Sequence, residues 1–128
     1  MPPIRVLIAD DHTLFRRGLV SLLSESGEFV VVGEARSGPE AVQRAAELRP
    51  DVVLMDVHMP QGGGVEAVEQ LKNIAPALPV IMLTVSDNDA DLVGAIRAGA
   101  KGYFLKNAET EELYTALRQA AAGQAVLD

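Results

Sequence analysis

Residues 4–11 read IRVLIADD, an apolar run that is interrupted only by Arg5 and ends in two adjacent carboxylates. Apolar runs without alternation are typical of strands that are buried on both faces of a parallel sheet. Four further segments have the length and composition of strands: 29–32, 52–55, 80–83 and 102–105. We therefore expect five strands, and the first of them leads directly into Asp10 and Asp11.

Segments with helical spacing separate these runs. Phe15, Leu19 and Leu22 recur at the interval of one helix face, and Ser37 followed by Gly-Pro predicts the start of another helix. Three glycines lie where helices are expected to end: Gly27, Gly99 and Gly123. Three carboxylates lie where they suit the positive end of the fourth predicted helix: Asp87, Asp89 and Asp91. Strands that alternate with helices predict an α/β fold with a parallel sheet, right-handed crossovers and helices on both faces.

Composition narrows the class of protein. The 128 residues, 48% of them hydrophobic, are enough for one domain with a real core. The net charge of −7 disfavours binding to nucleic acid or to an anionic membrane. Because the chain has no cysteine, disulfides, zinc-thiolate sites and thiol nucleophiles are excluded. The first strand reaches two carboxylates after a few apolar residues, so it is neither a signal peptide nor a membrane span.

Polar residues end four of the predicted strands. Asp10-Asp11 follow the first strand, Asp56 the third, Thr84 the fourth and Lys106 the fifth. Taken singly, each has an ordinary interpretation as a helix cap, a turn residue, a strand residue or a solvated amine. The carboxyl ends of parallel strands meet at one edge of a sheet, where ligands of such folds gather. Together these residues therefore indicate a site.

Three clustered carboxylates need a cation. Like charges resist ionising together unless an opposite charge joins them. Mg²⁺ prefers oxygen ligands, uses one or two carboxylates and leaves room for a phosphoryl oxygen. The absence of cysteines and of a histidine pair argues against zinc.

Four stretches resemble the receiver domain of bacterial two-component response regulators, which is CheY-like: VLIADDH, VVLMDVHMP, VIMLTVS and GAKGYFLKN. The resemblance covers essentially the whole chain, including Gly64 in the loop after Pro60 and Tyr103 three residues before Lys106. It implies a flavodoxin-like (βα)5 doubly wound sheet with strand order 2-1-3-4-5. Two departures, Asn107 in place of a common proline and the glycine-rich loop 61–64, leave the site residues intact.

The resemblance also implies roles at the site. Asp56 is the expected phosphoacceptor, and Asp11, Asp56 and the backbone carbonyl of His58 are the expected ligands of Mg²⁺, for which Mn²⁺ is a substitute. Asp10 is expected to act through a coordinated water. The His58 side chain is expected to face solvent or the phosphorylation site.

Three further residues complete the implied site. Thr84 and Lys106 are expected to contact phosphoryl oxygens, and Thr84 and Tyr103 to form the conformational switch. The expected donor is a sensor histidine kinase in the cytoplasm. The only chemistry expected of the domain is its own phosphorylation and dephosphorylation, so it is not expected to be an enzyme in the usual sense.

The stretches at 99–113 and 118–128 most resemble the NarL/FixJ branch, whose receivers precede a LuxR-type helix-turn-helix domain. This implies a receiver over residues 1–123, with residues 124–128 starting a linker to a C-terminal DNA-binding domain. Transcription regulation, contact with that domain and a homodimer are the corresponding expectations. The acidic receiver itself is not expected to bind nucleic acid.

Three alternatives stay open. A Mg²⁺-dependent phosphatase or phosphotransferase that forms an aspartyl phosphate usually has a second Asp two residues after the nucleophile, where this chain has His58. A flavin-binding electron carrier would need a phosphate-binding loop after its first strand, where Asp10 and Asp11 would repel phosphate. A receiver-like interaction module without phosphorylation should have lost acidic residues or Lys106, and it has not.

Overall fold

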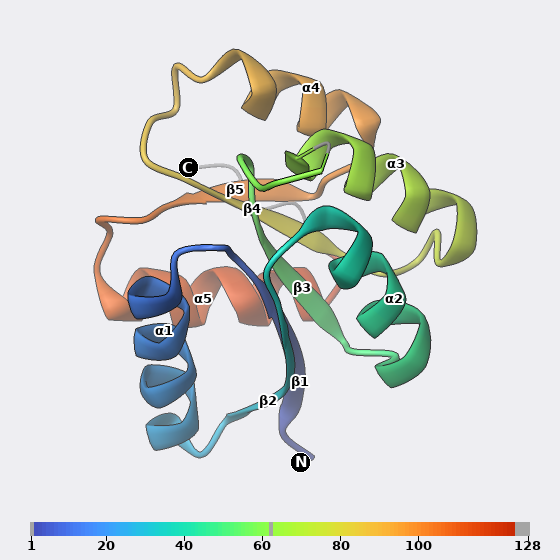
Figure 1. Ribbon diagram of the computed structural model, residues 1–128. Coiled ribbons are helices and arrows are strands. Elements are labelled where there is room, and N and C mark those ends of the chain that lie inside the picture. Colours follow the sequence, from blue (N-terminus) through green and yellow to red (C-terminus); the bar gives the residue numbers. More distant parts are fainter. Residues whose placement is uncertain (1, 62, 125–128) are drawn as a thin grey trace.

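The computed structural model describes residues 2–61 and 63–124, which form a parallel sheet between two layers of helices (Figure 1). The elements alternate along the chain: β1 Ile4–Ala9, α1 Thr13–Ser26, β2 Phe29–Ala35, α2 Gly38–Leu48, β3 Val52–Asp56, α3 Gly63–Ile74, β4 Val80–Thr84, α4 Ala90–Ala98, β5 Gly102–Leu105 and α5 Thr110–Ala121. No helix within the described ranges is both long and apolar enough to cross a membrane.

The strand order is β2-β1-β3-β4-β5, and every neighbouring pair is parallel. This confirms the predicted fold class and strand order. Helices α1 and α5 cover one face of the sheet, whereas α2, α3 and α4 cover the other (Figure 1). The order reverses direction at β1, so the ends of β1 and β3 flank the point where a ligand of such a fold is expected.

The central strands are buried on both faces. In β1, Val6 and Ile8 pack with α1 and α5, whereas Leu7 and Ala9 pack beneath α2 and α3. All five residues of β3 and of β4 are buried. Successive side chains of a strand point to opposite faces, so a strand covered twice must be apolar throughout. This is why the uninterrupted apolar runs predicted these strands.

The helix boundaries follow the local sequence. Ser37 caps α2, since its hydroxyl oxygen accepts a hydrogen bond from the backbone N–H of Glu40 at 3.2 Å. Asp89 caps α4 in the same way through the N–H of Asp91. Gly27 ends α1 with a φ of 74°, a left-handed conformation that glycine adopts without strain. Gly99 ends α4, as predicted.

Two expectations about the local structure were wrong. β2 extends three residues past the predicted 29–32, because a register shift between Val6 and Leu7 lets it stay paired with β1 as far as Ala35. Gly64 lies in the first turn of α3 rather than in the preceding loop. Residues 62 and 125–128, and with them most of the expected linker, lie outside the described residues.

Candidate functional site

Residues from four strands meet at one edge of the sheet. Asp10 follows β1, Asp56 ends β3, Thr84 ends β4 and Lys106 follows β5. Asp56 is level with Leu83 in the β3–β4 register. Because all these strands run in the same direction, their carboxyl ends bring residues that are distant in the sequence into one cluster.

Asp10, Asp56 and Lys106 form the centre of this cluster. The Lys106 ammonium donates to Asp56 Oδ2 at 3.2 Å and lies 2.8 Å from Asp10 Oδ2. Asp10 and Asp56 are 0% and 3% exposed, and the Lys106 side chain is 11% exposed. The Lys106 ammonium also lies 4.7 Å from the centre of the Phe15 ring, where a cation–π interaction helps to hold it.

The Asp56 carboxyl is difficult to ionise in this environment. Its pKa is raised, first by burial and then by the charge of Asp10, and the Lys106 ammonium and the His58 backbone N–H oppose that rise. The His58 N–H donates to Asp56 Oδ1 at 3.3 Å. One lysine thus faces two buried carboxylates and does not offset both, so a second cation would relieve the remaining repulsion.

The chemistry of the donor set fits such a cation. Among the described residues, no hydrogen-bond donor with suitable geometry reaches Asp10 Oδ2, even though this atom is buried and close to Lys106. The Lys106 ammonium pairs with this oxygen at 2.8 Å but also pairs with Asp56 Oδ2, so the two buried carboxylates together carry more negative charge than Lys106 offsets. Asp11 is more exposed and contributes a third carboxylate to the same group. The residues present therefore fit a hard divalent ion with oxygen ligands.

Thr84 and Tyr103, the expected switch pair, lie on the neighbouring strands β4 and β5. The Thr84 hydroxyl donates to the Ser86 carbonyl at 2.9 Å and accepts from the Ser86 N–H at 3.3 Å. Both of these hydrogen bonds hold the Thr84 hydroxyl in a local turn with Ser86. Tyr103 lies on β5 opposite Met82 and packs against the core beneath α3 and α4, where it is partly buried.

The His58 side chain is 59% exposed, in line with the expectation that it faces solvent, and it also has two carboxylate neighbours. Its Nε2–H donates to Asp89 Oδ2 at 2.6 Å, and its Nδ1 lies 3.4 Å from Asp91. Besides facing solvent, it thus joins the β3–α3 loop to the beginning of α4. The hydrogen bond with Asp89 raises the pKa of His58 and lowers that of Asp89.

Sequence reasoning missed two residues of the site. The His12 ring lies over the acidic cluster, with Nδ1 3.0 Å from Asp10 Oδ1 and 3.5 Å from Asp56 Oδ2. Arg16, only 4% exposed, donates from Nη1 to the Asp10 backbone carbonyl and from Nε to Glu34, both at 2.8 Å. The one signal for His12 was its position directly after the acidic pair. Arg16 lies one helical turn beyond that position, in α1, and no motif in the sequence marked it.

Gly64, in the first turn of α3, packs against the backbone of Asp56 and Val57 at the end of β3. Its backbone N–H donates to the Val57 carbonyl at 2.9 Å. A Cβ at this position would lie 2.7 Å from the Asp56 carbonyl oxygen and 2.7 Å from the methyl group of Met82. Only glycine allows α3 to begin this close to the end of β3.

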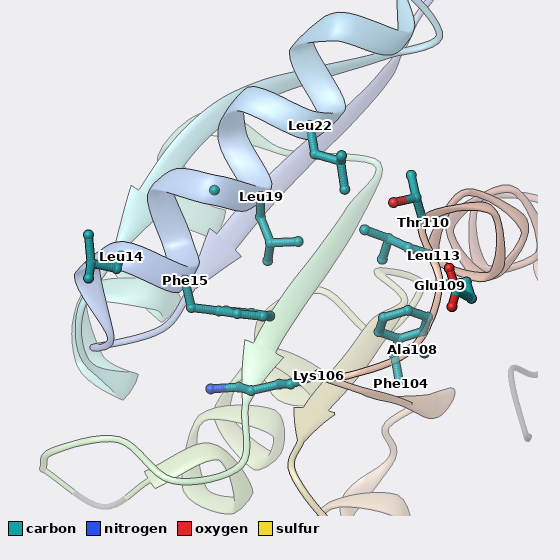
Figure 2. A pocket seen from close by; sticks show the side chains of 11 residues that line it. Leu14, Phe15, Leu19, Leu22, Phe104, Lys106, Ala108, Glu109, Thr110 and Leu113 are labelled. Carbon is teal, nitrogen blue, oxygen red and sulfur yellow. The ribbon is translucent and has the colours of Figure 1, made fainter.

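An apolar groove runs between α1 and α5 and opens beside Lys106. It has a volume of about 330 Å³ and is lined by Phe15, Leu19, Leu22, Phe104 and Leu113, among others. Figure 2 shows Phe15 and Lys106 side by side at one end of the groove. Leu14 lies at its rim with 91% of its surface exposed. This groove joins the site to an exposed apolar surface.

Residues 6–118 match the response regulator receiver domain family. The chain belongs to this family. It is 39% identical over 125 residues to the nitrate/nitrite response regulator NarL of Escherichia coli, which covers 98% of this chain and 58% of that protein. It is also 45% identical over 121 residues to the response regulator GacA of Pseudomonas viridiflava, covering 94% of this chain and 56% of GacA.

The solved structures agree with the sequence relatives. A LuxR-family two-component response regulator from Aurantimonas superimposes with a TM-score of 0.91 at 31% identity, over 99% of this chain and 90% of that one. The protein is thus a receiver domain of the NarL/LuxR type. The chain spans a little over half the length of the curated relatives it matches. Receiver domains are typically non-enzymatic signalling domains, and they generally bind Mg²⁺ at an acidic pocket.

Proposed function

We propose that this receiver accepts a phosphoryl group on Asp56 from a sensor histidine kinase and thereby controls a transcription-regulating output. The observation that carries the proposal is the buried Asp56 carboxylate, which is hydrogen bonded to Lys106 and adjacent to Asp10 and Asp11. A carboxylate is a competent nucleophile toward phosphorus when the negative charges are offset. The structure supports this role by placing the offsetting ammonium at the nucleophile.

The chemical step is a transfer between two nucleophiles. An Asp56 oxygen forms a bond to phosphorus as the phosphorus–nitrogen bond of the donor phosphohistidine breaks, and the electron pair leaves with the imidazole. The product is an acyl phosphate. Such a transfer requires in-line positioning and stabilisation of the phosphoryl oxygens rather than a dedicated general base. Lys106 and the Thr84 hydroxyl are the groups that we assign to those oxygens.

Four groups would hold the metal ion. Asp11, Asp56 and the His58 backbone carbonyl would bind Mg²⁺ directly, and Asp10 would bind through a water. When bound, Mg²⁺ or its substitute Mn²⁺ offsets the charge of the carboxylates and the phosphoryl group. The grouping of three carboxylates around the single Lys106 ammonium supports this assignment.

Phosphorylation would act through Thr84 and Tyr103. To reach a phosphoryl oxygen, the Thr84 hydroxyl must leave both of its bonds to Ser86. Its inward movement would free the space that Tyr103 then occupies, which is a shift between two packings of α4 and β5. Both residues therefore favour a signalling surface at that end of the sheet.

The kinase would dock over the groove between α1 and α5. A phosphohistidine must approach Asp56 from outside, and the protein that carries it must cover the surface around the site. The groove shares Lys106 with the site and presents the exposed Leu14. An apolar helical surface on the kinase would fit there.

We further propose the context of the domain. The receiver would span residues 1–123, and residues 124–128 would begin a linker to a C-terminal helix-turn-helix domain; the match to only 58% of the length of NarL supports a longer protein. The protein works in the cytoplasm, and phosphorylation promotes a homodimer that matches paired half-sites on DNA. The receiver would catalyse only its own phosphorylation and dephosphorylation, with no other enzyme activity, and would bind neither nucleic acid nor membranes.

Intact-mass measurement tests the proposal. Incubation with Mg²⁺ and a small acyl-phosphate donor should add one phosphoryl group to the protein. Asp56→Asn should abolish this addition, and excess chelator should prevent it. Labelling of the Asp56→Asn variant at the parent rate, or a label that maps to Thr84 or Ser86, would show that the assignment is wrong.

A further inference from the structure

A second hollow lies beside α1, on the side that faces β2 and α2 rather than α5. It is at the end of the edge strand β2, near the beginnings of α1 and α2, and has a volume of about 500 Å³. All of its lining residues are polar: four arginines, two glutamates and Thr13. None of them belongs to the phosphorylation site that we assign.

The arginines of the chain are concentrated in this hollow. Half of its eight arginines line it, although the chain as a whole carries a net charge of −7. Arg16 and Arg17 come from α1, Arg36 follows β2, and Arg44 lies on α2. Folding thus brings together four cations from three separate segments. Like charges that are held close together cost free energy unless opposite charges join them.

Glu34 holds two of the arginines side by side. Arg16 Nε donates to Glu34 Oε1 at 2.8 Å, and Arg17 Nη1 donates to Glu34 Oε2. Arg16 is only 4% exposed, and its Nη1 donates to the Asp10 carbonyl. Its Nη2 has no hydrogen-bond acceptor among the described residues, although Arg16 lines the hollow. A guanidinium that is already fixed in place can therefore still donate to a ligand.

Arg36 and Arg44 form no ion pair with any described carboxylate. Glu40 lies four residues before Arg44 on α2, a spacing that favours an ion pair on a helix. Glu40 Oε1 instead accepts the backbone N–H of Arg36 at 2.6 Å, which ties this glutamate to the beginning of α2. The hollow therefore has two more guanidinium groups than carboxylates.

We propose that this hollow binds a small molecule that carries a phosphate monoester group. Such a group has a charge of about −1.5 to −2 at pH 7 and three acceptor oxygens, which matches the two guanidinium groups in excess. Arginine is suited to the task, because its planar fork donates two parallel hydrogen bonds to phosphate oxygens. The inference does not depend on the proposed function.

The lining of the hollow favours a small ligand over a protein surface. Its volume lies in the range of small-molecule sites. A docked protein segment buries apolar and aromatic side chains at the centre of its contact, and the hollow has no apolar lining residue to receive them.

NMR titration of the metal-free protein with glycerol 3-phosphate tests the proposal. The pH is held near about 7.5, where the ester is a dianion, and the ionic strength is kept constant with NaCl. Saturable shifts should appear in the backbone amides of residues 13–17 and 34–44 and in the Nε–H signals of Arg16, Arg36 and Arg44. The dissociation constant should lie below about 1 mM, which two or three charge-assisted hydrogen bonds can supply.

Two variants test the arginines that have no carboxylate partner. Arg36→Gln and Arg44→Gln should each weaken binding by at least about tenfold, since each removes a charge-assisted hydrogen bond. Both side chains are exposed, so neither substitution should unfold the domain. Arg97→Gln is the matched control, because Arg97 is also exposed but lies in the last turn of α4. It should change binding by less than about twofold, since salt screens a distant charge.

Equal weakening in all three variants would show that the probe responds only to overall charge, and the inference would be wrong. Shifts confined to Asp56, Thr84 and Lys106 would place the probe at the phosphorylation site and would also overturn it, as would the absence of saturable shifts up to about 10 mM. A capped Glu-Glu dipeptide of the same charge is the second probe. If it binds the hollow more tightly than glycerol 3-phosphate does, the hollow recognises an acidic protein surface and the assignment to a phosphate monoester fails.

Discussion

Replacing Gly64 by alanine should destabilise the domain and displace Asp56. The added Cβ would meet the Asp56 carbonyl oxygen and the methyl group of Met82, each at 2.7 Å, and the Val57 carbonyl oxygen at 3.1 Å. Met82 can rotate away, but the two backbone oxygens cannot. The start of α3 must therefore move away from the end of β3 by several tenths of an ångström.

The magnitude follows from two opposing effects. Overpacking of this kind costs about 1–3 kcal/mol. Alanine recovers up to about 1 kcal/mol of helix propensity, and less in a first turn. The net loss should be about 1–2 kcal/mol. For 128 residues the unfolding entropy is about 0.27 kcal/mol per kelvin, so Tm should fall by about 4–7 °C.

Gly18→Ala is the matched control. Gly18 lies within α1, and a Cβ there would have no neighbour within 4 Å. The same substitution should therefore raise stability by about 0.5–1 kcal/mol. Calorimetric and urea unfolding of both variants measures the difference, and acyl-phosphate labelling should slow only in Gly64→Ala. The reasoning is refuted if Gly64→Ala is as stable as Gly18→Ala.

Three other predictions concern the surroundings of the site. Glu34→Ala leaves the buried Arg16 guanidinium without its carboxylate, and the free energy of unfolding in urea should fall by about 2–3 kcal/mol. This is less than for a fully buried ion pair, because Glu34 is 27% exposed. A loss below about 0.5 kcal/mol would contradict the pairing. By NMR in chelator, the pKa of His58 should exceed its ordinary 6.5 and fall in Asp89→Asn. Their ion pair should stabilise the fold most between about pH 4 and pH 6.5, weakening as pH rises through the raised pKa of His58 or falls through the lowered pKa of Asp89. Leu14→Ala should slow phosphoryl transfer from the sensor kinase by roughly tenfold, which corresponds to about 1.4 kcal/mol of lost apolar contact. Labelling by a small acyl phosphate should stay unchanged. Equal slowing of both reactions would place Leu14 in the site itself.

The positions of Asp10, Asp56, Thr84 and Lys106 were predictable from the sequence because each ends an apolar run. In a parallel sheet that pattern alone places residues at one edge. The succession of apolar runs does not determine the strand order, which was predicted from the resemblance to the receiver family. The structure confirms this strand order. The end of β2 was missed because its last residues follow a register shift that leaves no trace in hydrophobicity.

The side chains around the site were less predictable. The sequence did not show which carboxylates the two histidines would meet: His12 lies over the acidic cluster, and His58 pairs with the beginning of α4. Which carboxylate a ring meets depends on the packing of elements that are distant in the sequence. Arg16 is buried because Glu34 and the Asp10 carbonyl lie where its side chain passes, and neither is its neighbour in the chain.

The assembly of the site from four strands also bears on protein synthesis. Asp10 and Asp11 leave the ribosome first, Asp56 follows, and Lys106 emerges only after most of the chain has been made. Until β5 joins β4, the two buried carboxylates lack their ammonium partner. A nascent or truncated chain that ends before residue 106 should therefore compete poorly for phosphoryl groups. Under the proposed function, kinase output would then be reserved for receivers whose sheet is complete, and phosphorylation would act as a check on folding as well as a signal.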